Sequence, residues 1–60
     1  MTSKEFKQIR KRLELDQAEL AIEIGCERAT VTRYENGTMK ISTRTEKAVR
    51  NIAELTRLRS

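Results

Sequence analysis

The segment Asp16–Gly37, with the sequence DQAELAIEIGCERATVTRYENG, decides the fold of this 60-residue chain. Residues 17–24 place apolar side chains at helical spacing, and Gly25 follows the last of them, where a left-handed residue ends a helix at little steric cost. Residues 28–36 repeat the pattern, and Gly37 follows in the same way. The segment therefore predicts two short helices joined by a tight turn.

Three helix starts share one signature, a Thr or Asp followed three positions later by Glu. The pairs are Thr2–Glu5, Asp16–Glu19 and Thr43–Glu46. Each pair can satisfy two free backbone amides at a helix start. Together with the apolar periodicity, they predict helices over about 3–13, 17–24, 28–36 and 44–58, with a loop over 38–42. The inward residues are expected to be Phe6, Ile9, Leu13, Leu20, Ala21, Ile24, Val31, Tyr34, Glu35, Ala48, Val49, Ile52, Ala53 and Leu55.

The composition bounds the class of protein. Sixty residues predict one domain over 1–60, which buries only roughly 60% of its unfolded surface. The absence of Pro, the two Gly and the many helix-forming residues predict an all-α fold. With no His and one Cys, neither a disulfide framework nor a metal cluster is expected. No apolar stretch is long enough for a membrane, no signal peptide is evident and the Cys is unpaired, so we expect a cytoplasmic protein.

The charge is distributed unevenly along the chain. The net charge is +4, yet residues 14–27 carry only acids, and the basic residues lie before and after them. A molecule with one acidic side and basic material elsewhere suits a polyanion such as DNA. The alternative, that Lys and Arg merely solvate helix surfaces, stays open on charge alone.

The outward face of the helix over 28–36 carries unusual side chains. If Val31 faces the core, short residues and two arginines lie on the other side, namely Arg28, Ala29, Thr30, Thr32 and Arg33. Short side chains let a helix backbone approach the floor of a DNA groove. Arginine can then donate two hydrogen bonds to guanine, and an Ala or Thr methyl can contact the thymine methyl. The alternative is an ordinary exposed helix that is rich in Thr.

The motif Leu15–Ala21 (LDQAELA), Gly25 and the motif Thr30–Gly37 (TVTRYENG) resemble the Cro/C1-type (XRE-like) helix-turn-helix family, which includes the lambdoid phage repressors. The resemblance spans residues 3 to about 42. It implies a four-helix, lambda-repressor-like domain with a helix-turn-helix over 16–37. It also implies sequence-specific binding of double-stranded DNA, with the second helix of the motif in the major groove.

The resemblance implies roles for the matching residues. The family reads bases at the positions of Arg28, Ala29, Thr32 and Arg33. It contacts backbone phosphates at the positions of Gln17, Thr30, Asn36 and Lys40. In some members, residues matching Arg10 and Glu35 form a largely buried structural ion pair, although Arg10 could also be a mere surface charge.

Two residues depart from the family pattern. Glu27 stands at the cap position of the helix over 28–36, where the family often has Ser or Thr. Near phosphates a carboxylate is repulsive, so Glu27 either turns away or accepts a hydrogen bond from cytosine and contributes to base choice. Cys26 stands where the family often has Val, and we interpret it as a small core residue and not a redox group.

The C-terminal helix, about 43–58, departs from the two short helices of many relatives. We expect it to cover the core and to leave apolar surface for a second copy of the chain, at Ile52, Leu55 and Leu58. A homodimer would place two recognition helices about 34–36 Å apart on a palindromic operator. The alternative is a monomer that dimerises only on DNA.

The sequence thus predicts a dimeric DNA-binding repressor that acts by promoter occlusion and can regulate its own operon, as small phage and mobile-element regulators of the family do. The rival is an antitoxin or adaptor whose DNA binding is secondary, although no spare segment is evident for wrapping a toxin. An enzyme is not expected, because the chain has no His, no Gly-rich phosphate loop and no paired acids. No cofactor, metal, small-molecule ligand or membrane partner is expected.

Overall fold

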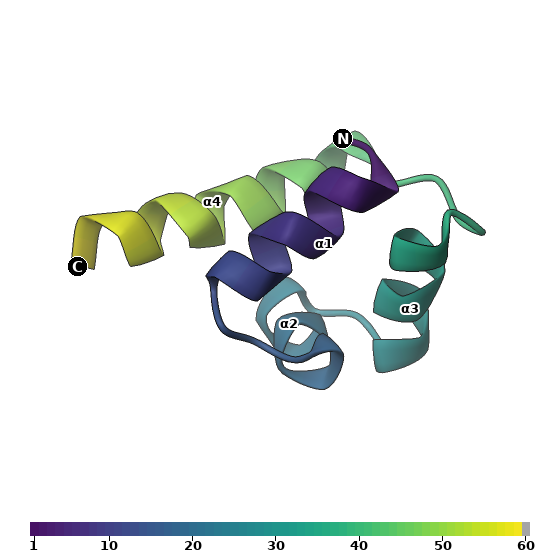
Figure 1. Cartoon of the computed structure of the whole chain (residues 1–60), viewed down its shortest axis with the longest axis horizontal. Coiled ribbons are helices and arrows are strands. Elements are labelled where there is room, and N and C mark those ends of the chain that lie inside the picture. Colours follow the sequence, from purple (N-terminus) through teal and green to yellow (C-terminus); the bar gives the residue numbers. More distant parts are fainter. Residues whose placement is uncertain (60) are drawn as a thin grey trace.

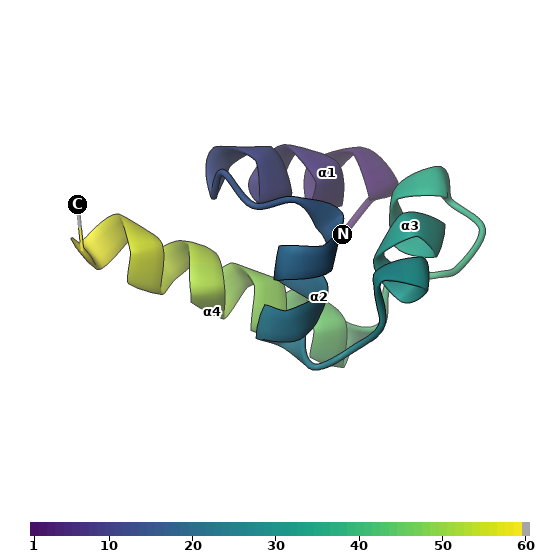
Figure 2. The same ribbon diagram turned by 90° about the horizontal axis from the view of Figure 1, so that it is seen from below.

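A computed structural model describes residues 1–59 of the chain as four helices, without strands in that range. They are α1 (Ser3–Arg12), α2 (Gln17–Ile24), α3 (Arg28–Asn36) and α4 (Thr43–Arg59), shown in Figure 1. The first three pack around a small core, and α4 runs along α1 and α2 and then past them (Figures 1 and 2). The expected all-α helix-turn-helix fold is confirmed.

Two of the three predicted capping pairs are present. The side chain of Thr2 accepts from the Glu5 amide, and the Glu5 carboxylate accepts from the Thr2 amide. The pair of Asp16 and Glu19 does the same at the start of α2, where the two N–O distances are 2.7 and 2.9 Å. These reciprocal bonds satisfy amides that have no partner inside the helix, which fixes where α1 and α2 begin.

The predicted capping pair of Thr43 and Glu46 is wrong. Thr43 is already the first residue of α4, and the hydroxyl of Ser42 accepts from the Thr45 amide at 3.1 Å. Ser42 is as good a cap as Thr43 and comes one residue earlier. The Glu46 carboxylate binds the Met1 amino group at 2.7 Å instead of a capping amide.

Helices α2 and α3 end as expected at Ile24 and Asn36, and each is followed by a left-handed glycine, Gly25 with φ of 72° and Gly37 with φ of 77°. Helix α1 ends at Arg12, one residue before the predicted Leu13. There the left-handed position is taken by Glu14, with φ of 59°. Its amide donates to the carbonyl of Lys11 at 3.0 Å, and the next amide reaches back to Arg10 at 3.4 Å. This is the hydrogen-bond pattern of a Schellman motif, formed here without glycine.

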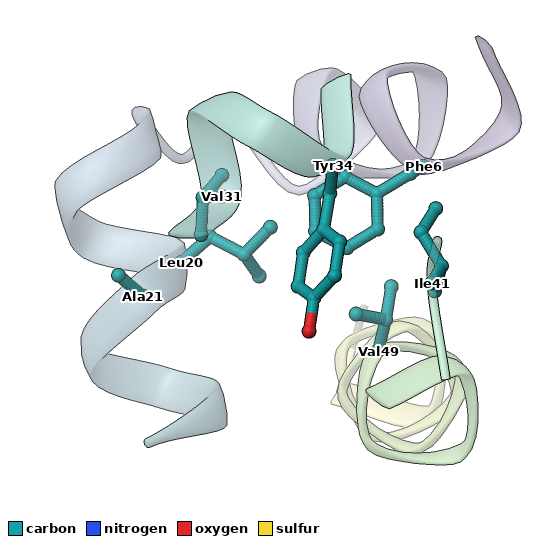
Figure 3. Close-up of a cluster of buried hydrophobic side chains, with 7 residues drawn as sticks. All are labelled: Phe6, Leu20, Ala21, Val31, Tyr34, Ile41 and Val49. Atoms are coloured by element: carbon teal, nitrogen blue, oxygen red, sulfur yellow. The ribbon is translucent and has the colours of Figure 1, made fainter. Parts of the chain in front are cut away.

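The core is a single cluster of side chains from all four helices and the loop before α4 (Figure 3). Its buried members are Phe6, Leu20, Ala21, Val31, Tyr34, Ile41 and Val49. The rings of Phe6 and Tyr34 lie 5.5 Å apart and are tilted by 55°, a favourable aromatic arrangement. The Tyr34 hydroxyl lies 3.2 Å from the Thr45 hydroxyl, so the polar end of the ring has a partner.

Two core expectations need correction. Ile41, placed in a loop by the sequence pattern, is only 9% exposed and packs in the core. Leu55, expected on the inward stripe of α4, is 53% exposed. Leu55 lies beside Glu23 of α2, where the two side chains line an open hollow outside the core cluster. Leu58, near the end of α4, is 72% exposed.

Candidate nucleic-acid interface

Helices α2 and α3 are joined by the short turn over residues 25–27, which sets one helix across the other. The turn closes through the Cys26 amide, which donates to the Ala21 carbonyl at 2.9 Å. Val31 and Tyr34 anchor the inner side of α3 in the core. Burial of this side leaves the opposite side of α3 at the surface, at the end of the molecule away from the C-terminus of α4 (Figure 1).

The five residues expected on the outward face of α3 are all at least partly accessible. Arg28, Ala29 and Arg33 are exposed, and Thr30 and Thr32 are half-buried. Two long cationic side chains thus stand at the ends of a surface that is otherwise made of short residues. Such a surface can enter a groove and donate hydrogen bonds to base edges.

Glu27 is the N-cap residue of α3, with extended backbone angles, but its side chain makes no capping hydrogen bond. It is exposed. The carboxylate also affects its neighbour Cys26, which is half-buried against the core. Burial raises the pKa of the Cys26 thiol above its ordinary value, and the negative charge of Glu27 raises it further. A thiol kept protonated in this way is a poor nucleophile.

Arg10 and Glu35 form an ion pair that joins α1 to the end of α3. Arg10 Nε lies 2.6 Å from Glu35 Oε2, and Arg10 Nη2 lies 3.1 Å from Glu35 Oε1. The two side chains are 13% and 3% exposed. A third donor of Arg10, Nη1, binds the Leu15 carbonyl at 2.9 Å in the turn before α2. One guanidinium therefore holds α1, the α1–α2 turn and α3 in a fixed arrangement.

Gln17 extends this network to the outward side of α3, a connection that the sequence did not predict. Its Nε2 donates to Glu35 Oε1 at 3.2 Å, and its Oε1 accepts from the Thr32 hydroxyl at 2.8 Å. The Thr32 hydroxyl also lies 3.2 Å from the Arg28 carbonyl. A direct hydrogen bond thus joins Gln17, which is expected to contact a phosphate, to Thr32, which is expected to read a base.

The residues expected to contact phosphates lie on α3, in the loop that follows it and at the start of α2. Asn36 is the last residue of α3 and Lys40 lies in the following loop, and both are exposed. Gln17 is the first residue of α2, where backbone amides favour an anion. Between the starts of α2 and α3 lies a shallow hollow of about 320 Å³, lined by Arg10, Asp16, Gln17, Ala18 and Arg28.

Within residues 1–59, no group of three or more His, Cys, Asp or Glu side chains is placed to hold a metal ion. Within the same residues, no helix combines the length and the apolar character that crossing a membrane requires.

The bundle and the exposed α3 define a helical domain of the DNA-binding type. Residues 3–59 match the family described as "Helix-turn-helix domain", and the chain belongs to that family. Searches of curated proteins and of solved structures found no match. Membership points to DNA binding, to regulation of transcription and to a role other than catalysis.

Proposed function

We propose that this chain is a Cro/C1-type regulator that binds a specific sequence of double-stranded DNA and represses transcription. The observation that carries the proposal is the outward side of α3, where Arg28 and Arg33 are exposed beside the short Ala29. Bidentate hydrogen bonds from arginine to guanine are the commonest specific contact in the major groove. The ion pair of Arg10 and Glu35 supports this role, because it fixes the helix that would read the bases.

Phosphate contacts set the position of α3 in the groove. We assign them to Gln17, Thr30, Asn36 and Lys40, which lie at or near the two ends of α3 and at the start of α2. If about five phosphates per subunit are neutralised in all, by Lys40 and by other basic side chains at the DNA surface, a dimer has a slope of about −9 for log affinity against log salt concentration. The slope measures the number of neutralised phosphates, in specific and in non-specific binding alike.

Glu27 contributes to base choice in this proposal. Its carboxylate is exposed at the start of α3 and is not used as a cap, so it is free to accept from the cytosine amine. In Glu27→Gln, the amide can both accept and donate, and we expect the preferred base at one position to change. An unchanged set of bound sequences, with raised affinity alone, would show that Glu27 only repels phosphates.

The functional unit is a homodimer formed through the C-terminal half of α4. Leu55 and Leu58 are exposed there, and Ile52 is half-buried beside them. Ile52 and Leu55 also line a small hollow of about 150 Å³ with Glu23 and Thr56. A two-fold contact would bury the same apolar residues of both copies, as closed dimers do. The dimer then presents two α3 helices to a palindromic operator.

Selection of bound sequences from random duplex DNA tests the proposed function. A dimeric regulator enriches one inverted repeat whose half-sites lie about one DNA turn apart. Enrichment of a single half-site without symmetry would contradict the dimer and leave specific binding intact. No enrichment, together with a protein that co-purifies with the chain, would favour the adaptor or antitoxin alternative.

A further inference from the structure

The hydroxyl group of Thr32 is engaged within the protein. It has one proton, which it donates to Gln17 Oε1 at 2.8 Å, with the Arg28 carbonyl at 3.2 Å as a second acceptor. A threonine hydroxyl can donate only once. Thr32 therefore has no proton left for a base acceptor such as guanine O6 or thymine O4. What its side chain can still offer to a groove is its methyl group and a lone pair.

The orientation of the Gln17 amide is fixed from both sides. Its nitrogen faces a carboxylate oxygen of Glu35, which can only accept, and its oxygen faces the hydroxyl of Thr32. Rotation of the amide by 180° would place oxygen against oxygen at Glu35. Glu35 in turn is held by Arg10 at 2.6 Å. The buried ion pair thus determines which atom of Gln17 the Thr32 hydroxyl meets.

We infer that Thr32 reads a thymine through its methyl group, and that Gln17 and Glu35 are the residues that position it to do so. This inference rests on the proposed function, because it requires α3 to lie in a major groove. The thymine methyl is the one apolar group that a base presents there. A threonine whose hydroxyl is tied back into the protein is suited to contact that methyl.

Deoxyuridine provides the test, because it pairs like thymine and lacks only the methyl group. Each thymine of the selected half-site is replaced in turn by deoxyuridine, and the dissociation constant is measured. For one thymine we expect affinity to fall about fourfold, the effect of one buried methyl group. Thr32→Ser, which keeps the hydroxyl and removes the methyl, should abolish this uracil penalty. Thr32→Val, which keeps the methyl group and removes the hydroxyl, should keep the uracil penalty.

Gln17→Ala tests the positioning role separately. Loss of a phosphate contact would weaken binding to the thymine and uracil duplexes alike and leave their ratio unchanged. Loss of positioning should also lower the uracil penalty, since Thr32 can then turn its hydroxyl outward. The double variant Gln17→Ala/Thr32→Val should restore the penalty, because valine strongly prefers one rotamer in a helix.

The outcomes separate this inference from the function on which it rests. If no sequence is enriched from random DNA, the proposed function is wrong and the inference fails with it. Two results would overturn the methyl contact alone, provided that a sequence is enriched. One is a uracil penalty that is absent or that persists in Thr32→Ser, and the other is the loss of the penalty in Thr32→Val. An unchanged ratio in Gln17→Ala would overturn the positioning role. Circular dichroism of each variant checks that the helices are intact.

Discussion

Arg10 and Glu35 lie 25 positions apart in the chain and form a two-bond ion pair, with nitrogen–oxygen distances of 2.6 and 3.1 Å. The pair connects the end of α1 to the end of α3 across a molecule with a small core. It also binds Gln17, so it holds both helices of the helix-turn-helix.

Breaking this pair should be costly. Glu35→Ala leaves the guanidinium of Arg10 largely buried without its charged partner, and we expect the free energy of unfolding to fall by about 3–5 kcal/mol. A domain of this size has only roughly 3–9 kcal/mol in total, so the variant should be partly unfolded at 25 °C. Urea denaturation followed by circular dichroism measures the change.

An exposed pair on α4 provides the control. Arg57 and Glu54 are 79% and 56% exposed, and their charged atoms are 3.8 Å apart. Glu54→Ala should change stability by less than about 1 kcal/mol. If Glu35→Ala lowers the free energy of unfolding by no more than Glu54→Ala does, the structural role of the Arg10–Glu35 pair is contradicted.

Glu14 stores a small amount of backbone strain that a substitution can release. It takes the left-handed conformation at φ 59°, where a side chain is disfavoured. Glu14→Gly should raise the free energy of unfolding by about 0.5–1 kcal/mol, since relief of strain outweighs the added freedom of the unfolded chain. Glu14→Ala keeps the strain, so thermal unfolding should show no comparable gain in stability for this variant. Equal gains in both variants would point to the lost charge instead.

Glu46 should make stability depend on pH. Hydrogen bonds from the Met1 amino group and from Arg50 hold the pKa of its carboxyl below the ordinary value. The stabilisation is fully present above the pKa that the Glu46 carboxyl has in the unfolded chain. It is lost as the pH falls through the lower pKa that this carboxyl has in the folded state. The melting temperatures of the natural chain and of Glu46→Gln should therefore differ at neutral pH and converge in acid.

The oligomeric state should respond to the end of α4 and not to exposed apolar residues in general. Leu58 is 72% exposed, so Leu58→Glu should leave the fold intact and place a charge in the proposed dimer contact. Sedimentation equilibrium should then show a monomer. Ile22→Glu is the matched control, because Ile22 is 78% exposed on α2, outside the proposed contact. A natural chain that is monomeric at tens of micromolar would contradict the dimer in solution.

The helices were predictable because their signals are local. Two capping pairs and two glycines fix the bounds of α2 and most of those of α1 and α3. The start of α4 was misplaced by one residue, because Ser42 and Thr43 are both good caps and only packing decides between them.

The parts that the sequence did not predict depend on tertiary placement. Ile41 has no helical period and is buried because the loop folds over the core. Leu55 has the right period and is exposed, because it lies at an open hollow beside α2 and outside the core cluster. The bond between Gln17 and Thr32 joins residues 15 positions apart on two helices. No local pattern marks such a bond, although the α2–α3 turn makes it possible.

Substitutions on and beside α3 should separate base reading from phosphate contact. Arg28→Ala and Arg33→Ala should each weaken specific binding by about 1–3 kcal/mol and relax the preference at one base pair. Lys40→Ala should weaken binding to all sequences alike and reduce the salt slope by about 2 in the dimer, about 1 for each subunit. Titrations of the selected duplex and of a scrambled duplex at several salt concentrations measure both effects.

The most direct test of sequence reading by α3 is the ratio of affinities for the selected duplex and for a scrambled duplex of the same composition. For the natural chain at physiological salt we expect a ratio of at least about 10³. For Arg28→Ala/Arg33→Ala we expect it to fall by at least about thirtyfold, while Lys40→Ala keeps it. A ratio near one for the natural chain, or an undiminished ratio in the double arginine variant, would contradict sequence reading by α3.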